Sequence, residues 1–246
     1  MKVFLSSVGT ALILRSQQGL LLLEPDPSDT MASLGVMSTG PDVLAVSDRD
    51  RILQAMAECC AERGYRATTV DAVSERAGVE RESFEALFAD KEDCALAALN
   101  KIVSETVTQL SMIDLRTESG MEKQVREIQA ILQLLAARAS FARLGCIEAR
   151  QVASARMRDS YEAAARVLAL MIERAGSVAP RGASSVTARA ALGGAEALAR
   201  RELAIGGASN LPKLLPDFVY GVLVPFVGQQ EALRQAKLAA RVAEEG

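Results

Sequence analysis

Side chains that could carry out covalent or metal chemistry are few in this sequence of 246 residues. Histidine is absent, which excludes a histidine general base, a Ser-His-Asp triad and a histidine-ligated metal centre. The cysteines are Cys59, Cys60, Cys94 and Cys146, and no two of them have the CxxC spacing of a redox or zinc motif. We therefore expect no catalytic residue, no cofactor and no metal, and we expect the thiols to be inert in a reducing cytosol.

Polar residues that could instead contact a partner molecule gather between residues 68 and 91. They are Thr68, Thr69, Glu80, Arg81, Glu82, Ser83, Glu85 and Lys91. A threonine cap followed by apolar residues at helical spacing, with a glycine at position 78, predicts two short helices over about 69–77 and 80–87. Two such helices after a longer one form a helix-turn-helix, whose second helix lies in the major groove of DNA.

The same helical spacing continues along most of the chain. Apolar residues recur three and four positions apart from residue 52 onward, and no run alternates with the period of a strand over a useful length. Further helices are predicted over 91–110, 118–138, 141–153, 155–175, 185–205 and 211–227, with a last one ending near 244. Asp90 and Asp93 have the spacing of a near capping box at the start of the first of these. The sequence predicts an all-α fold.

Composition divides the chain into three parts. Residues 1–46 hold two short apolar runs and then a segment rich in Pro, Gly, Ser and Asp, and neither run is long enough to span a membrane. We predict a poorly ordered leader there. Residues 47–94 contain seven basic and twelve acidic residues and form the predicted helix-turn-helix domain, with the motif itself at about 69–88. Residues 95–246 form a second helical domain.

Residues 51–94 resemble the DNA-binding domain of the TetR family of one-component transcriptional regulators. The likeness is carried by GYRATTV at 64–70, AGV at 77–79 and FEALFADKE at 84–92. The resemblance implies a cytoplasmic, non-enzymatic, ligand-responsive repressor that acts as a homodimer on a double-stranded DNA operator. Residues 95–246 would then bind a small-molecule effector and form the dimer, with no membrane partner.

The resemblance also implies roles for single residues. Thr68, Thr69 and the N–H groups that follow them would bind a phosphate, and Lys91 would grip another. Glu80, Arg81, Glu82 and Ser83 occupy the positions of the second helix that contact bases and phosphates, and Glu85 stands where a tyrosine that contacts the DNA backbone is typical.

The charge of the second short helix leaves an alternative open. Three carboxylates face Arg81 alone between residues 80 and 87, and exposed carboxylates oppose binding to polyanionic DNA. Glutamate can accept a hydrogen bond from cytosine N4, which explains one glutamate that contacts the bases but does not explain three. The alternative is a helical dimerisation or protein-interaction module whose degenerate helix-turn-helix no longer binds DNA.

Two features of the second domain have both a functional and a plain structural interpretation. A stripe of small and apolar residues on 185–205 favours close helix approach across a dimer, or ordinary packing within the chain: Ala188, Ala191, Leu192, Ala195, Leu198 and Ala199. Apolar residues of 211–227 would be its interface partner. A second set could line an apolar cavity or belong to the core: Met112, Met121, Phe141, Met157, Tyr161 and Met171.

Overall fold

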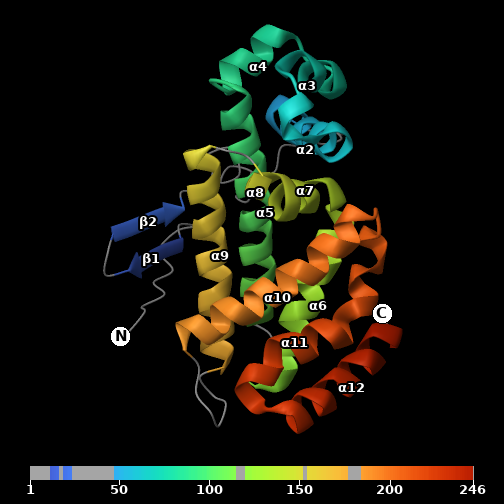
Figure 1. Ribbon diagram of the computed structural model, residues 1–246. Coiled ribbons are helices and arrows are strands. Elements are labelled where there is room, and N and C mark those ends of the chain that lie inside the picture. Colours follow the sequence, from blue (N-terminus) through green and yellow to red (C-terminus); the bar gives the residue numbers. More distant parts are fainter. Residues whose placement is uncertain are drawn as a thin grey trace, which may run out of the picture. The chain divides into compact units, whose positions relative to one another are not determined.

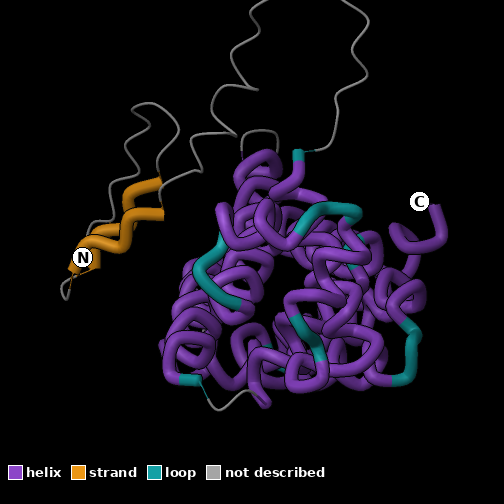
Figure 2. The backbone as a smooth tube through the Cα atoms, turned by 90° about the horizontal axis from the view of Figure 1, so that it is seen from above, coloured by secondary structure: helices purple, strands orange, loops and turns teal. Residues whose placement is uncertain are grey.

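The computed structural model describes residues 12–16, 19–23, 47–114, 120–151, 154–176 and 184–245. Contacts within the chain define two compact units, Met1–Ala45 and Val46–Gly246. In the second unit every described regular element is a helix, as Figures 1 and 2 show. The predicted all-α class is confirmed for this body.

The first unit contains a hairpin that the sequence did not predict. Strands β1 (Leu12–Ser16) and β2 (Gly19–Leu23) pair antiparallel, with Leu12 opposite Leu23 and Ser16 opposite Gly19. The two strands coincide with parts of the two apolar runs, and a short continuous apolar run has no periodicity that distinguishes a strand from a helix. The prediction of a poorly ordered leader otherwise concerns residues outside the described segments.

Four helices open the second unit: α2 (Asp48–Ala67), α3 (Val70–Ala77), α4 (Arg81–Leu87) and α5 (Lys91–Asp114). Thr69 caps α3 by accepting a hydrogen bond from the Ala72 N–H, and Gly78 ends it in the left-handed conformation at φ 64°. Asp90 accepts a hydrogen bond from the Asp93 N–H at 2.7 Å, so the predicted cap at the start of α5 is confirmed. The long helix α5 crosses the predicted boundary at residue 94 and continues into the second domain (Figure 1).

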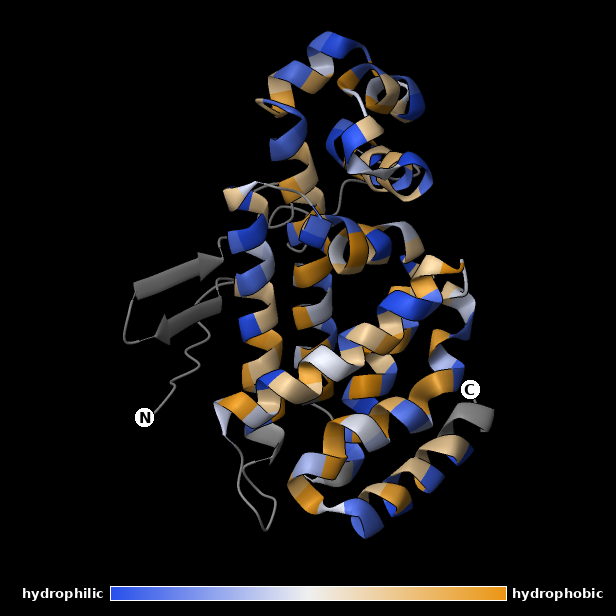
Figure 3. Ribbon diagram, viewed as in Figure 1, coloured by the Kyte–Doolittle hydropathy of each residue, from blue (hydrophilic) through white to orange (hydrophobic). Residues whose placement is uncertain are grey.

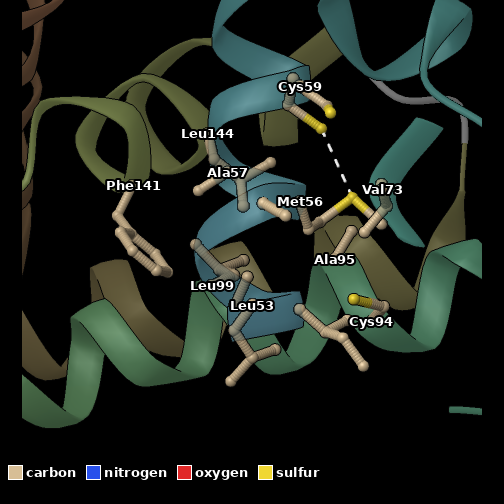
Figure 4. Close-up of a cluster of buried hydrophobic side chains, with 14 of the residues drawn as sticks. Leu53, Met56, Ala57, Cys59, Val73, Cys94, Ala95, Leu99, Phe141 and Leu144 are labelled. Carbon is tan, nitrogen blue, oxygen red and sulfur yellow. Dashed lines mark hydrogen bonds between the residues drawn. The ribbon is translucent and has the colours of Figure 1, made fainter. Parts of the chain in front are cut away.

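The core under these helices combines aromatic rings with thiols and small side chains (Figure 4). Phe84 and Phe88 are buried, with ring centroids 5.5 Å apart. Cys59, Cys60 and Cys94 are also buried, and burial raises the pKa of Cys60 to about 11. These three thiols are therefore structural, as the sequence predicted.

The remaining helices follow the predicted ranges with two irregular segments. They are α6 (Met121–Ala137), α7 (Ala139–Arg143), the π-helix η1 (Leu144–Glu148), α8 (Ala149–Gln151), α9 (Ala155–Gly176), α10 (Ser185–Ala204), the 3₁₀ helix η2 (Ala208–Leu214), α11 (Leu215–Val227) and α12 (Gln229–Glu245). The predicted helix over 141–153 is thus interrupted by a π-turn, and the predicted start of 211–227 is a 3₁₀ segment that contains Pro212. A proline lacks the N–H that a regular helix would need there.

The predicted dimer stripe on α10 is used inside the chain. Ala188, Ala191, Leu192 and Ala199 are buried, and the apolar face of α11 is buried as well. The alternative interpretation of ordinary intramolecular packing therefore holds for these two faces.

We expect the small aromatic core to control the stability of the helix-turn-helix. Phe84→Ala should lower the free energy of unfolding by about 3–5 kcal/mol, because Phe84 is buried in a packed core. Leu87→Ala on the same helix, where the side chain is 40% exposed, should cost less than about 1 kcal/mol. Urea unfolding of both variants checks this, and equal losses would contradict it.

Candidate DNA-binding surface and effector cavity

Ion pairs and hydrogen bonds from α2 fix the geometry of the helix-turn-helix. Arg76 of α3 pairs with Glu58 and Glu62 of α2, and the Cys59 thiol donates to the Ala72 carbonyl at 3.7 Å. Arg51 of α2 donates to the Gly78 carbonyl at 3.5 Å. The turn between α3 and α4 is therefore held from the supporting helix.

The two threonines ahead of α3 have different environments. Thr68 is buried, and its hydroxyl donates to the Gly64 carbonyl at 2.9 Å. Thr69 is exposed, and it lies at the N-terminus of α3, where the first N–H groups of a helix have no partner within the helix. Of the two threonines predicted to contact a phosphate, Thr69 therefore lies on the surface and Thr68 does not.

Lys91 lies in a contact that the sequence did not reveal. Its ammonium donates to the carbonyls of Tyr65 at 3.0 Å and Thr68 at 2.8 Å, and it lies over the Tyr65 ring, 4.4 Å from the centroid. Two of its three N–H donors therefore join the start of α5 to the end of α2.

Arg81 of α4 is held between two carboxylates. Its guanidinium donates to Asp71 of α3 at 2.5 Å and to Glu85 of α4 at 2.7 Å, and these bonds, the one to Glu85 first and the one to Asp71 second, raise the pKa of Arg81. Asp71 lies outside the predicted site residues, since ten positions separate it from Arg81 in the sequence. Arg81, the cation expected to contact the DNA bases, is thus paired with carboxylates on the surface of the helix-turn-helix.

The outer side of α4 is acidic. Glu80, Glu82 and Glu85 are exposed, and Ser83 is half-buried. Figure 3 shows α4 as a largely hydrophilic end of the domain. The structure brings these residues together with Arg81 on one short segment, whereas Thr68 is buried and the half-buried Lys91 donates to backbone carbonyls of Tyr65 and Thr68.

A mostly apolar cavity of about 220 Å³ lies among the C-terminal helices. Its wall takes residues from α5, α6, α7, η1, α9, α10 and α11, including Leu99, Ile131, Phe141, Leu168 and Phe218. This volume exceeds the ~150 Å³ of a cavity that holds benzene and falls below the ~300–1,000 Å³ of drug-sized sites. The cavity is suited to a small apolar molecule.

The predicted cavity residues divide between wall and core. Phe141 and Tyr161 line the cavity, whereas Met157 is buried in the adjoining core and Met112 is 45% exposed. The side chains of Met121 and Met171 lie outside the described part of the chain. The half-buried Cys146 is a wall residue that the sequence did not single out, and burial raises its pKa to about 11.

At one side of the cavity, Tyr161 and Glu196 of the wall form a hydrogen-bonded group with Arg150, which is not itself a wall residue; this group is referred to below as the polar corner. The Tyr161 hydroxyl donates to Glu196 at 2.6 Å, and Arg150 donates to the Tyr161 oxygen at 2.7 Å and to Glu196 at 3.4 Å. Burial raises the pKa of Tyr161 to about 12, and the bond to Glu196 adds to this. The hydroxyl therefore remains a neutral donor at physiological pH.

Hydrogen bonds around Tyr65 join the helix-turn-helix domain to elements that line the cavity. Gly64 kinks α2 with φ 78°, a conformation that strains other residues. Directly after it, the Tyr65 N–H donates to the Glu148 carboxylate of η1 at 2.9 Å, while the Tyr65 carbonyl accepts from Lys91 of α5. Both η1 and α5 contribute wall residues to the cavity, so the two structures that hold Tyr65 also line the candidate effector site.

No single helix among the described residues has the length and apolar character of a membrane span, although the bent pair Glu122–Ala137 and Ala139–Gln151 reaches that composition jointly across an angle of 104°. Within the same segments, no group of three or more acidic or cysteine side chains could hold a metal ion.

Comparison with known proteins agrees with this geometry. Residues 52–98 match the family of bacterial regulatory proteins, tetR family. The fatty acid degradation regulator FadR from Bacillus halodurans superposes with a TM-score of 0.62 at 16% identity, over 77% of this chain and 97% of that one. FadR from Bacillus subtilis, solved in complex with stearoyl-CoA, superposes with a TM-score of 0.61 at 18% identity. The superposition covers 72% of this chain and 97% of that one.

A third structure extends the likeness. A gamma-butyrolactone receptor described as ArpA-like gives a TM-score of 0.56 at 22% identity, over 81% of this chain and 98% of that one. A search of curated proteins found no match. Residues 52–98 thus match the family of bacterial regulatory proteins, tetR family, and the chain shares the fold of these solved regulators.

The paired state of Arg81 predicts a measurable effect of its partner. Glu85→Gln should tighten binding to generic duplex DNA, because it removes a carboxylate and frees Arg81. Glu122→Gln on α6 makes the same charge change in an exposed i,i+4 pair with Arg126, away from the motif, and should leave affinity unchanged. Anisotropy titrations compare the DNA affinities of the two variants. An affinity of Glu85→Gln equal to that of the wild type would refute the expectation that the Glu85 carboxylate weakens DNA binding.

Proposed function

We propose that this protein is a cytoplasmic, homodimeric, ligand-responsive repressor that binds a double-stranded DNA operator. The observation that carries the proposal is the direct connection between the two sites: α5 begins beside the helix-turn-helix and lines the cavity with Leu99 and Ile102. A degenerate interaction module is not favoured, because residues 52–98 keep the family pattern and the motif keeps its bracing contacts.

DNA contact would begin at the N-terminus of α3 and along α4. Thr69 and the adjacent N–H groups would bind a phosphate, and a second phosphate would compete with Asp71 and Glu85 for Arg81. Exposed ion pairs of this kind contribute little stability, so their exchange for a phosphate contact costs little. One glutamate among Glu80, Glu82 and Glu85 would accept a hydrogen bond from a cytosine amino group.

The effector response would pass through Tyr65, which would act as a hinge between the cavity and the helix-turn-helix. A molecule entering the cavity shifts η1 relative to α5, because both supply its walls. Such a shift changes the Glu148 and Lys91 contacts on Tyr65 and tilts α2 with the helix-turn-helix. The effector favours release of the operator if it binds the tilted arrangement more tightly than the DNA-binding one.

The subunits would meet on the outer face of α10. Val186, Ala190, Gly193 and Ala197 are exposed along that face, and space is open around the position of a Cβ at Gly193. Val186 is 77% exposed, an unusual state for a large aliphatic side chain unless a partner covers it. Small residues at these positions let a second copy of the helix approach closely.

The regulator proposal is tested by fluorescence anisotropy against tiled duplexes from the upstream region of its own gene. Tight binding to one tile that weakens steeply with salt is expected, because phosphate contacts release counterions. Arg81→Ala should make the free energy of binding to that tile less favourable by about 1–3 kcal/mol. If no tile binds better than random DNA at low salt, the proposal fails.

The dimer face is tested by charge insertion. Ala197→Arg should convert the dimer into monomers in sedimentation velocity, because it places a long cation where two helices approach. Gln133→Arg, at an exposed position of α6, makes the matched insertion and should leave the dimer intact. Dimers in both variants would show that the subunits use another face.

A further inference from the structure

The wall of the cavity is selective in charge as well as in shape. Nearly all of its residues are apolar, and its charged members are Glu127 and Glu196. Among the described wall residues none is lysine or arginine. Neither carboxylate offers a buried anionic head group a partner and no cation lies on the wall, so such a group would be buried unpaired, which is strongly unfavourable.

The two carboxylates are already compensated from behind. Glu127 lies 3.9 Å from Lys123 across one turn of α6, and Glu196 takes hydrogen bonds from Tyr161 and Arg150. Neither Lys123 nor Arg150 is a wall residue. The site therefore has little need of a cationic ligand and remains unfavourable for an anionic one.

The polar corner can accept one more hydrogen bond. A carboxylate has about four acceptor positions, and the bonds from Tyr161 and Arg150 both go to Oε2 of Glu196. A ligand hydroxyl at this corner could donate to Glu196 while its carbon chain lies along the apolar wall. Scaling from ~150 Å³ for the six carbons of benzene, a cavity of about 220 Å³ holds roughly nine carbons.

We infer that the effector is an uncharged medium-chain amphiphile of roughly nine carbons, with a hydroxyl group that donates to Glu196 at the polar corner. The inference rests on the proposed function, because it assigns the ligand of the same cavity. Arg150 lies two residues after Glu148, so a ligand at this corner acts directly beside the segment that holds Tyr65.

The experiment titrates the full chain by calorimetry with 1-nonanol, nonanoate and nonylammonium, which share one chain and differ in charge. Nonanol should bind saturably and at least about tenfold more tightly than nonanoate, because like charges brought together cost well over that factor. Equal binding of nonanoate, or tighter binding of nonylammonium, overturns the uncharged assignment. Binding of stearoyl-CoA as tight as that of nonanol overturns the size assignment.

A pair of variants locates the selectivity. Glu196→Gln should improve nonanoate binding about tenfold, because it removes the facing charge while keeping the shape of the side chain. Glu162→Gln, next to Tyr161 on α9 but paired with Arg189 away from the cavity wall, should leave all three affinities unchanged. Equal effects of both variants on nonanoate binding would show that Glu196 is not the source of the charge selectivity.

The failure of this inference is distinguishable from that of the proposed function. Operator titrations with the same preparation report on the regulator independently of any ligand. A protein that binds its operator but none of the three nine-carbon probes contradicts the effector class alone. A protein that binds nonanol selectively but no DNA contradicts the regulator alone.

Discussion

Two hydrogen bonds on the backbone of Tyr65 connect α2 of the helix-turn-helix domain to η1 and α5, which line the cavity. The N–H donates to Glu148 of the π-turn, and the carbonyl accepts from Lys91 of α5. Gly64 makes the arrangement possible, since its positive φ kinks α2 where the Glu148 carboxylate approaches to 3.5 Å from the position of a Cβ. A π-turn in η1 is consistent with a functional role there, because such insertions are frequent at functional sites.

The DNA-binding end combines a well-braced motif with an acidic reading surface. Arg51 and Arg76 hold the geometry from α2 and α3, while Arg81 is occupied by Asp71 and Glu85. In the proposed complex with DNA, carboxylates on α4 would lower the affinity for every DNA sequence, and a correctly placed cytosine amino group would offset one of them. If the protein binds an operator, its affinity for other sequences is correspondingly low. Selectivity would then come from the charge of α4 as much as from direct contacts.

Local signals predicted much of the fold. Thr69, Gly78 and Asp90 define helix ends through bonds within a few residues, so their roles follow from the sequence alone. The π-turn in η1 has no such local signal. The face of α10 that is buried could not be chosen from small residues alone, since Ala and Gly occur on both of its sides.

The sequence predicted where the candidate DNA-binding residues lie along the chain, but not which side chains they contact. Residues 80–85 lie on the exposed short helix, as their spacing indicated, but the pairing of Arg81 with Asp71 joins residues ten positions apart. Lys91 and Thr68 were expected to face DNA, and their contacts with Tyr65 and Gly64 come from the packing of α5 against α2. Such contacts depend on the tertiary structure, and periodicity carries no information about them.

The central claim is that the bond between Glu148 and Tyr65 joins the cavity to the DNA-binding helices. Amide hydrogen exchange at Tyr65, measured in the wild type and in Glu148→Ala together with operator affinity, tests it most directly. We expect a slowly exchanging Tyr65 amide in the wild type, with faster exchange and altered operator affinity in the variant while the melting temperature stays nearly constant. Unchanged exchange at Tyr65 with unchanged operator affinity would contradict it.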